Sequence, residues 1–121
     1  MENQRAPEPH YGEELAEATN GIVRLFHECY GRGPTKAKSY LLEDRYLVCI
    51  LGETMTTVER TLASKGEQAL VREVRLRFQE AMSESFHDVV EEATGRRVVS
   101  YNSQLLTDVD VGLEFFILED R

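Results

Sequence analysis

A short run of small and charged residues, Gly31-Arg32-Gly33-Pro34, is followed by Thr35 and Lys36. Glycine allows backbone angles closed to other residues and proline stops a helix, so the run predicts a built turn. Its N–H groups, beside Arg32 and Lys36, could form a concave site for a phosphate, carboxylate or bicarbonate-like anion. The spacing is not that of a phosphate-binding loop, and the preceding helix end disfavours anions. Two interpretations stay open: a structural corner, and a contact for a ligand or partner.

A second polar pattern, Thr56-Thr57-Val58-Glu59, has the spacing of a helix capping box. In that motif a threonine hydroxyl and a glutamate three residues later satisfy free N–H groups at the helix start. We expect a short helix that ends at Gly66. The turn and the capping box could together line a small-ligand pocket. The candidate ligand- or partner-binding residues are therefore Gly31, Arg32, Gly33, Pro34, Lys36, Thr56 and Glu59.

The aspartates, histidines, serines and cysteines show no pattern typical of a metal site or a catalytic site. Asp108 and Asp110 could meet a cation, but the ligand pattern of a calcium loop is absent, so a solvated loop is favoured. The three histidines are too dispersed for zinc, and no serine or cysteine has a recognisable base partner. We expect no catalytic residue, no metal and no cofactor. An enzyme remains an alternative without support from any motif.

Charge and composition exclude several classes of function. The chain has 121 residues with 22 Asp plus Glu against 14 Lys plus Arg, a formal net charge of −8. This balance disfavours binding to nucleic acid and to anionic lipid. No apolar run approaches the roughly 20 residues of a membrane helix, and the start does not resemble a secretory signal. Cys29 and Cys49 fall in apolar patterns and are interpreted as buried, reduced thiols. We expect a cytoplasmic protein without direct membrane insertion.

Hydrophobic periodicity predicts the elements that position these residues. Residues 1–10 predict a disordered tail, and residues 11–121 a single domain. Apolar residues at spacings of three and four predict a helix from Gly12 to Gly31. Hairpins are predicted from strands over 39–42 and 46–51, and from strands over 98–103 and 111–118. The fold class is α+β, with a four-stranded antiparallel sheet in the order α-β-β-α-α-β-β and helices packed on it.

One predicted helix, over residues 67–93, is longer than a domain of this size needs. At 1.5 Å per residue it spans roughly 40 Å, against an expected radius of gyration of about 14 Å. Its apolar stripe is expected to run through Leu70, Val74, Phe78, Ala81, Met82, Phe86, Val89 and Ala93. We expect a homodimer with this helix at or near the interface. The alternative is a helix that curves or breaks near Ser83-Glu84-Ser85.

Six short motifs along the chain form a combination: the 31–34 turn, the Leu47–Leu51 run, Met55–Leu62, Thr94-Gly95 with Val98, Thr107-Asp108 and Phe115–Leu118. Together they resemble the MpsC family, formerly a bacterial domain of unknown function. The resemblance covers about residues 10–119. Met55 stands where the family usually has leucine.

The resemblance implies a small accessory protein of a sodium-translocating, membrane-potential-generating system linked to bicarbonate uptake. It implies no catalytic residue and no transport by this chain. The first hypothesis is an interaction module that contacts the cytosolic face of a membrane transport system. The alternative is a sensor domain that binds a small anion or another small ligand.

Overall fold

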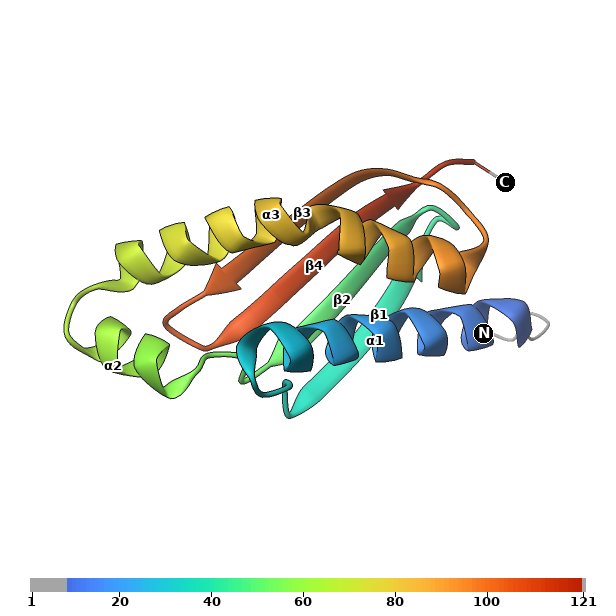
Figure 1. Ribbon diagram of the computed structural model, residues 1–121. Coiled ribbons are helices and arrows are strands. Elements are labelled where there is room, and N and C mark those ends of the chain that lie inside the picture. Colours follow the sequence, from blue (N-terminus) through green and yellow to red (C-terminus); the bar gives the residue numbers. More distant parts are fainter. Residues whose placement is uncertain (1–8, 121) are drawn as a thin grey trace.

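The computed structural model describes residues 9–120, which form three helices and four strands (Figure 1). Their chain order is the α-β-β-α-α-β-β of the predicted α+β fold, which is confirmed. The elements are α1 (Pro9–Tyr30), β1 (Lys36–Leu42), β2 (Tyr46–Gly52), α2 (Thr57–Ser64), α3 (Gln68–Thr94), β3 (Val98–Leu106) and β4 (Val111–Leu118).

The four strands form one open antiparallel sheet in the order β1-β2-β4-β3. Each predicted hairpin is present, and β2 joins β4 at the centre. β1 begins three residues earlier than predicted, because Lys36 pairs with Gly52 at the far end of β2. β3 extends to Leu106, three residues beyond its predicted end, because Leu106 pairs with Val111. Pairing with the neighbouring strand therefore sets these ends.

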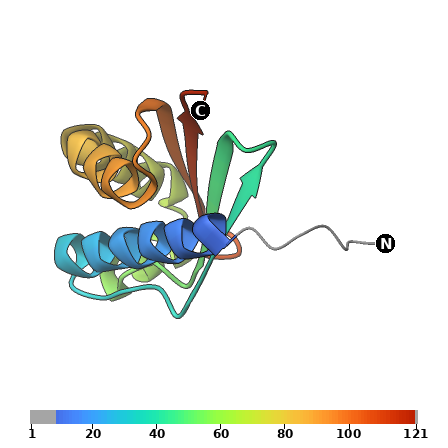
Figure 2. The ribbon, with the colours of Figure 1, turned by 90° about the vertical axis from the view of Figure 1, so that its right-hand side faces the viewer.

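Helices α1 and α3 cover one face of the sheet, as Figures 1 and 2 show. The two helices approach closely at Gly21, where an added Cβ would lie 3.0 Å from the Cβ of Val89. A larger residue at Gly21 would therefore push the helices apart. The core between helices and sheet contains Ala18, Ile22, Phe26, Leu47, Cys49, Leu51, Phe86, Val90, Val98, Phe116 and Leu118.

Helix α3 is continuous over its 27 residues, so it has no break at residues 83–85. Part of its predicted apolar stripe is wrong. Leu70 and Val74 are 44% and 54% exposed, whereas Val71 and Val90 are buried. The reason is Arg75, which is only 8% exposed and takes an inward position that periodicity assigns to an apolar residue.

Three other predictions concern the start of the chain, the cysteines and membrane-spanning segments. Helix α1 begins at Pro9, inside the segment predicted as a tail, and residues 1–8 lie outside the described range. Both thiols are free, as predicted; Cys49 is buried and Cys29 is only half-buried. Within residues 9–120, no helix combines the length and the hydropathy that crossing a membrane requires.

The second face of the sheet has no helix over it among the described residues (Figure 2). Successive side chains of a strand point to opposite faces, so the residues that alternate with the core positions lie here. We call this surface the open sheet face. Most of its positions are apolar, and we call them its apolar centre: Tyr40, Leu42, Tyr46, Val48, Ile50, Val111, Leu113, Phe115 and Ile117. Polar residues lie on the two edge strands, Lys36 and Lys38 on β1 and Ser100, Asn102 and Gln104 on β3, where Leu106 is also exposed.

Candidate functional site

The turn at residues 31–34 is tied to the segment that precedes α2. Gly31 has a φ of 76°, and its N–H donates to the carbonyl of His27 at 3.0 Å. This left-handed conformation favours glycine and ends α1. Arg32 Nη1 donates to the carbonyl oxygen of Met55 at 2.8 Å. The guanidinium that could have met an anion therefore holds the backbone next to Thr56.

The capping box at the start of α2 is confirmed. The Thr56 N–H donates to Glu59 Oε1 at 2.9 Å, and the Glu59 N–H donates to Thr56 Oγ1 at 3.1 Å. Glu59 has a second role that the spacing did not predict. It accepts hydrogen bonds from Arg75 Nε at 2.6 Å and Nη2 at 2.7 Å. Lys36 lies apart from this group, on the open sheet face.

Arg75 on α3 contacts the loop of residues 53–56 and residues of α1 and α2 beside that loop. Its Nη2 also donates to the carbonyl of Thr54 at 2.9 Å, and its guanidinium lies 4.1 Å from the centre of the Tyr30 ring. Asp110 approaches the same loop and accepts from the N–H groups of Thr54 and Met55 at 2.9 and 3.0 Å. The loop containing Asp110 was expected to be solvated; this carboxylate instead fixes backbone, because β4 begins directly beside the loop. We call residues 53–56 the hub loop.

The environment of Glu59 keeps its carboxylate charged. Burial raises the pKa of Glu59, but hydrogen bonds from Arg75 and Thr56 outweigh burial and hold the pKa below 4.5. Burial opposes the charge on Arg75, and the hydrogen bonds to Glu59 outweigh it and raise the pKa of Arg75. The pair is therefore ionised throughout the neutral range and serves a structural purpose.

A second polar group, missed at the sequence level, crosses the sheet beneath the helices. Strand register places Ser39, Cys49, Glu114 and Ser103 side by side on four successive strands. The hydroxyl of Thr19 on α1 lies 2.5 Å from that of Ser39. We call these five residues the interior polar row. It lies on the sheet face that otherwise supplies the core.

Glu114 is the ionisable centre of this row and is only 1% exposed. Tyr101 donates its hydroxyl to Oε1 at 2.5 Å, and Ser103 donates to Oε2 at 2.6 Å. Burial raises the pKa of Glu114 to about 7, against the opposing effects of Ser103, Tyr101 and Arg75. The carboxyl group therefore changes its protonation state near neutral pH, unlike Glu59.

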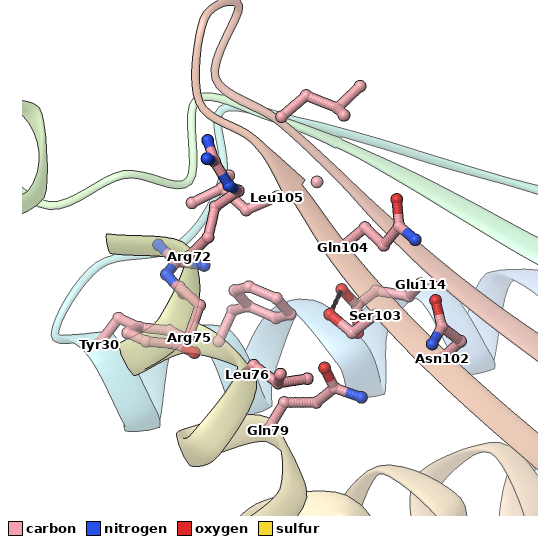
Figure 3. A pocket seen from close by; sticks show the side chains of 13 residues that line it. Tyr30, Arg72, Arg75, Leu76, Gln79, Asn102, Ser103, Gln104, Leu105 and Glu114 are labelled. Carbon is pink, nitrogen blue, oxygen red and sulfur yellow. Dashed lines mark hydrogen bonds between the residues drawn. The ribbon is translucent and has the colours of Figure 1, made fainter. Parts of the chain in front are cut away.

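A pocket of about 280 Å³ opens between α3, the end of α1 and strand β3, and Glu114 lies in its wall (Figure 3). Tyr30 and Arg75 form one side, and Leu76 with Gln79 form another. With its amide oriented to satisfy both groups, Gln79 bonds the backbone N–H and carbonyl of Ser103 at 3.2 and 3.1 Å. Gln79 thus covers part of the free edge of β3.

The sequence did carry a signal for Glu114. In the strand Val111–Leu118 the alternate positions 112, 114, 116 and 118 are buried. A glutamate in phase with Phe116 and Leu118 must therefore point into the core. Among residues 9–120, no three or more His, Cys, Asp or Glu side chains converge as a metal site would require.

The family model described as Na+-translocating membrane potential-generating system (MpsC) matches residues 12–120. That range includes the turn, the hub loop and the interior polar row. No curated protein and no solved structure matches the sequence.

Replacing one partner of the buried ion pair should lower the free energy of unfolding far more than replacing both partners. We expect Glu59→Gln or Arg75→Met to lower the free energy of unfolding by about 3–5 kcal/mol, because each leaves an uncompensated buried charge. The double variant Glu59→Leu/Arg75→Met should recover part of that loss. Urea unfolding followed by circular dichroism measures all three.

The exposed pair Glu73–Arg77 on α3 is the matched control for this experiment, with side chains 57% and 76% exposed. Its removal should change the free energy of unfolding by no more than about 0.5 kcal/mol. Equal losses at the buried and exposed pairs would contradict the role assigned to Arg75.

Glu114 should make stability depend on pH in a defined direction. Its pKa is higher in the folded state, about 7, than the ordinary value of 4.5, so folding favours its protonated form. Its contribution to stability is complete below pH 4.5 and is lost as pH rises through 7. We expect Glu114→Gln to flatten the decline in urea midpoint between pH 5 and pH 8. Glu84→Gln, at an exposed position of α3, should leave that decline unchanged.

Proposed function

The chain belongs to the MpsC family, and on that premise we propose that it is an accessory component of a Na+-translocating, membrane-potential-generating system. In this proposal it works in the cytoplasm, binds protein partners rather than catalysing a reaction, and does not itself carry ions. A link of the system to bicarbonate uptake is part of the same proposal.

The observation that carries the proposal is the open sheet face. Its apolar centre includes Tyr40, Leu42 and Ile50, which are 43%, 52% and 39% exposed. Tyr46 and Phe115 stack there at 6.3 Å between ring centres with an angle of 12° between the planes. Apolar patches of this continuity on a folded chain are typical of protein–protein contacts. The surface therefore supports a binding role better than the 31–34 turn, whose arginine is engaged with Met55.

Membrane vesicles from cells that hold the system but lack this chain test the proposal. We expect added wild-type protein to sediment with these vesicles and not with vesicles that lack the system. Ile50→Glu should reduce the bound fraction by about tenfold or more, because a charge then enters the centre of the contact.

Val74→Glu serves as the control, since Val74 is also exposed, at 54% against 39% for Ile50, and lies on helix α3 rather than on the sheet. It should sediment like the wild type. Equal sedimentation with both kinds of vesicle would refute the accessory role.

A second candidate function, a small-ligand sensor, is favoured by the pocket beside Glu114. A space of about 280 Å³ with aromatic, cationic and carboxyl groups in its wall can enclose a small organic molecule. In this alternative the ligand site is the pocket and not the 31–34 turn. A ligand bound there would contact both α3 and the sheet.

Thermal-shift measurements with bicarbonate, nucleotides and organic anions test the sensor. A ligand at 100 times its Kd should stabilise the fold by about 2.7 kcal/mol. Leu76→Trp, which fills the pocket from a side chain that is 48% exposed, should abolish that effect. Arg32→Ala should leave it intact. A screen without any shift would count against a sensor.

A further inference from the structure

The open sheet face has a charge distribution unlike that of the rest of the chain. Each of the four strands supplies four alternating positions to it, and none of those positions holds aspartate or glutamate. The chain as a whole has 22 acidic residues and a net charge of −8. Two copies therefore repel one another over most of their surface. The strand positions of the open sheet face carry no carboxylate, although Glu53 and Asp110 border it at one end, so two such acidic chains can meet there with little direct repulsion.

The size of the face suits a contact between folded chains. Four strands about 4.8 Å apart and seven residues of about 3.4 Å each give roughly 450 Å² in projection. Two copies face to face would bury about twice that area, and more once protruding tyrosine and lysine side chains are included. This approaches the roughly 1,200 Å² at the lower end of specific interfaces.

We propose that the open sheet face binds the same face of a second copy, which forms a two-fold dimer of back-to-back sheets. The inference rests on the binding role proposed above: it assigns the open sheet face to a second copy, so the dimer as a whole would be what binds the membrane system. The helices α1 and α3 of both copies would then lie on the outside. This replaces the long helix as the expected dimer contact.

Strand register selects one orientation of the two-fold axis. An axis parallel to the strands places β2 over the partner's β4, so the apolar residues of these two strands coincide, while Tyr40 and Leu42 of β1 lie over the partner's β3. It also places Lys38 over the partner's Gln104, where the ammonium group meets an amide oxygen. An axis across the strands would instead set β1 on β1, with the lysines of both copies at one edge. Aligned packing of this kind is common between twisted sheets.

The proposed contact surface contains aromatic rings with positively charged side chains beside them. Lys38 lies 5.8 Å from the centre of the Tyr40 ring, and the Arg45 guanidinium lies 5.8 Å from that of Tyr46. Both cations sit at the border of the apolar centre, where Arg45 lies against the ring of Tyr46, which in turn stacks with Phe115. Large rigid aromatic side chains with a charged border are typical of interface hot spots.

Light scattering coupled to size-exclusion chromatography tests the dimer directly. The wild-type chain should have twice the 13.9 kDa mass of one copy. Ile50→Glu should raise the dimer Kd about 30-fold or more and yield a folded monomer, because position 50 is solvent-facing in one copy. Val74→Glu should remain dimeric. A monomeric wild type, or a monomer produced by Val74→Glu alone, would overturn the proposal.

Cross-linking tests the axis in a Cys29→Ser background. A mixture of Lys38→Cys and Gln104→Cys chains should be joined by a short bismaleimide, whereas Lys38→Cys alone should not. The reverse result would overturn the parallel axis. A dimer that fails to sediment with the vesicles above refutes the accessory role and leaves the dimer. A monomer that does sediment refutes the dimer and leaves the accessory role.

Discussion

The ion pair between Arg75 and Glu59 is the interaction on which the arrangement of the elements depends. Glu59 caps α2 with one oxygen and binds Arg75 with both, so a single carboxylate starts one helix and fixes another. Arg75 also binds the Thr54 carbonyl and lies against the Tyr30 ring, which places the end of α1. Ion pairs removed from water are stable only when their geometry and remaining hydrogen bonds are well satisfied. Here the hub loop supplies those bonds.

Each face of the sheet carries residues that are unusual for its surroundings. The face beneath the helices carries Glu114 and the rest of the interior polar row, whereas the face without helices carries an apolar centre. The same alternation of β4 produces both, since Glu114 points inward while Leu113 and Phe115 point outward. Polar groups in a core favour one arrangement of strands, because a shift in register would leave Glu114 without Tyr101 and Ser103. The interior polar row thus specifies the pairing of the strands.

Local patterns predicted the order of elements, both hairpins and the capping box, because these depend on residues close together in sequence. The position of Glu114 also follows from strand alternation. The burial of Arg75 does not, because its partner Glu59 lies 16 residues away and only the tertiary fold brings them together. Because Arg75 was not expected to be buried, the predicted apolar stripe of α3 included Leu70 and Val74, which are exposed in the structure. The roles of Arg32 and Asp110 likewise depend on backbone of the hub loop that sequence alone does not place.

The position of Cys49 gives the sheet a chemical reporter of its own. Its thiol is fully enclosed in β2 between Ser39 and Glu114. Burial raises its pKa to about 11, with Ser39 opposing and Glu114 adding to the effect, so almost none of it is thiolate at neutral pH. Alkylation of Cys49 therefore requires the central strands to separate from the helices. With Cys29 replaced, the rate at which Cys49 is modified in the native state would report how readily the core opens.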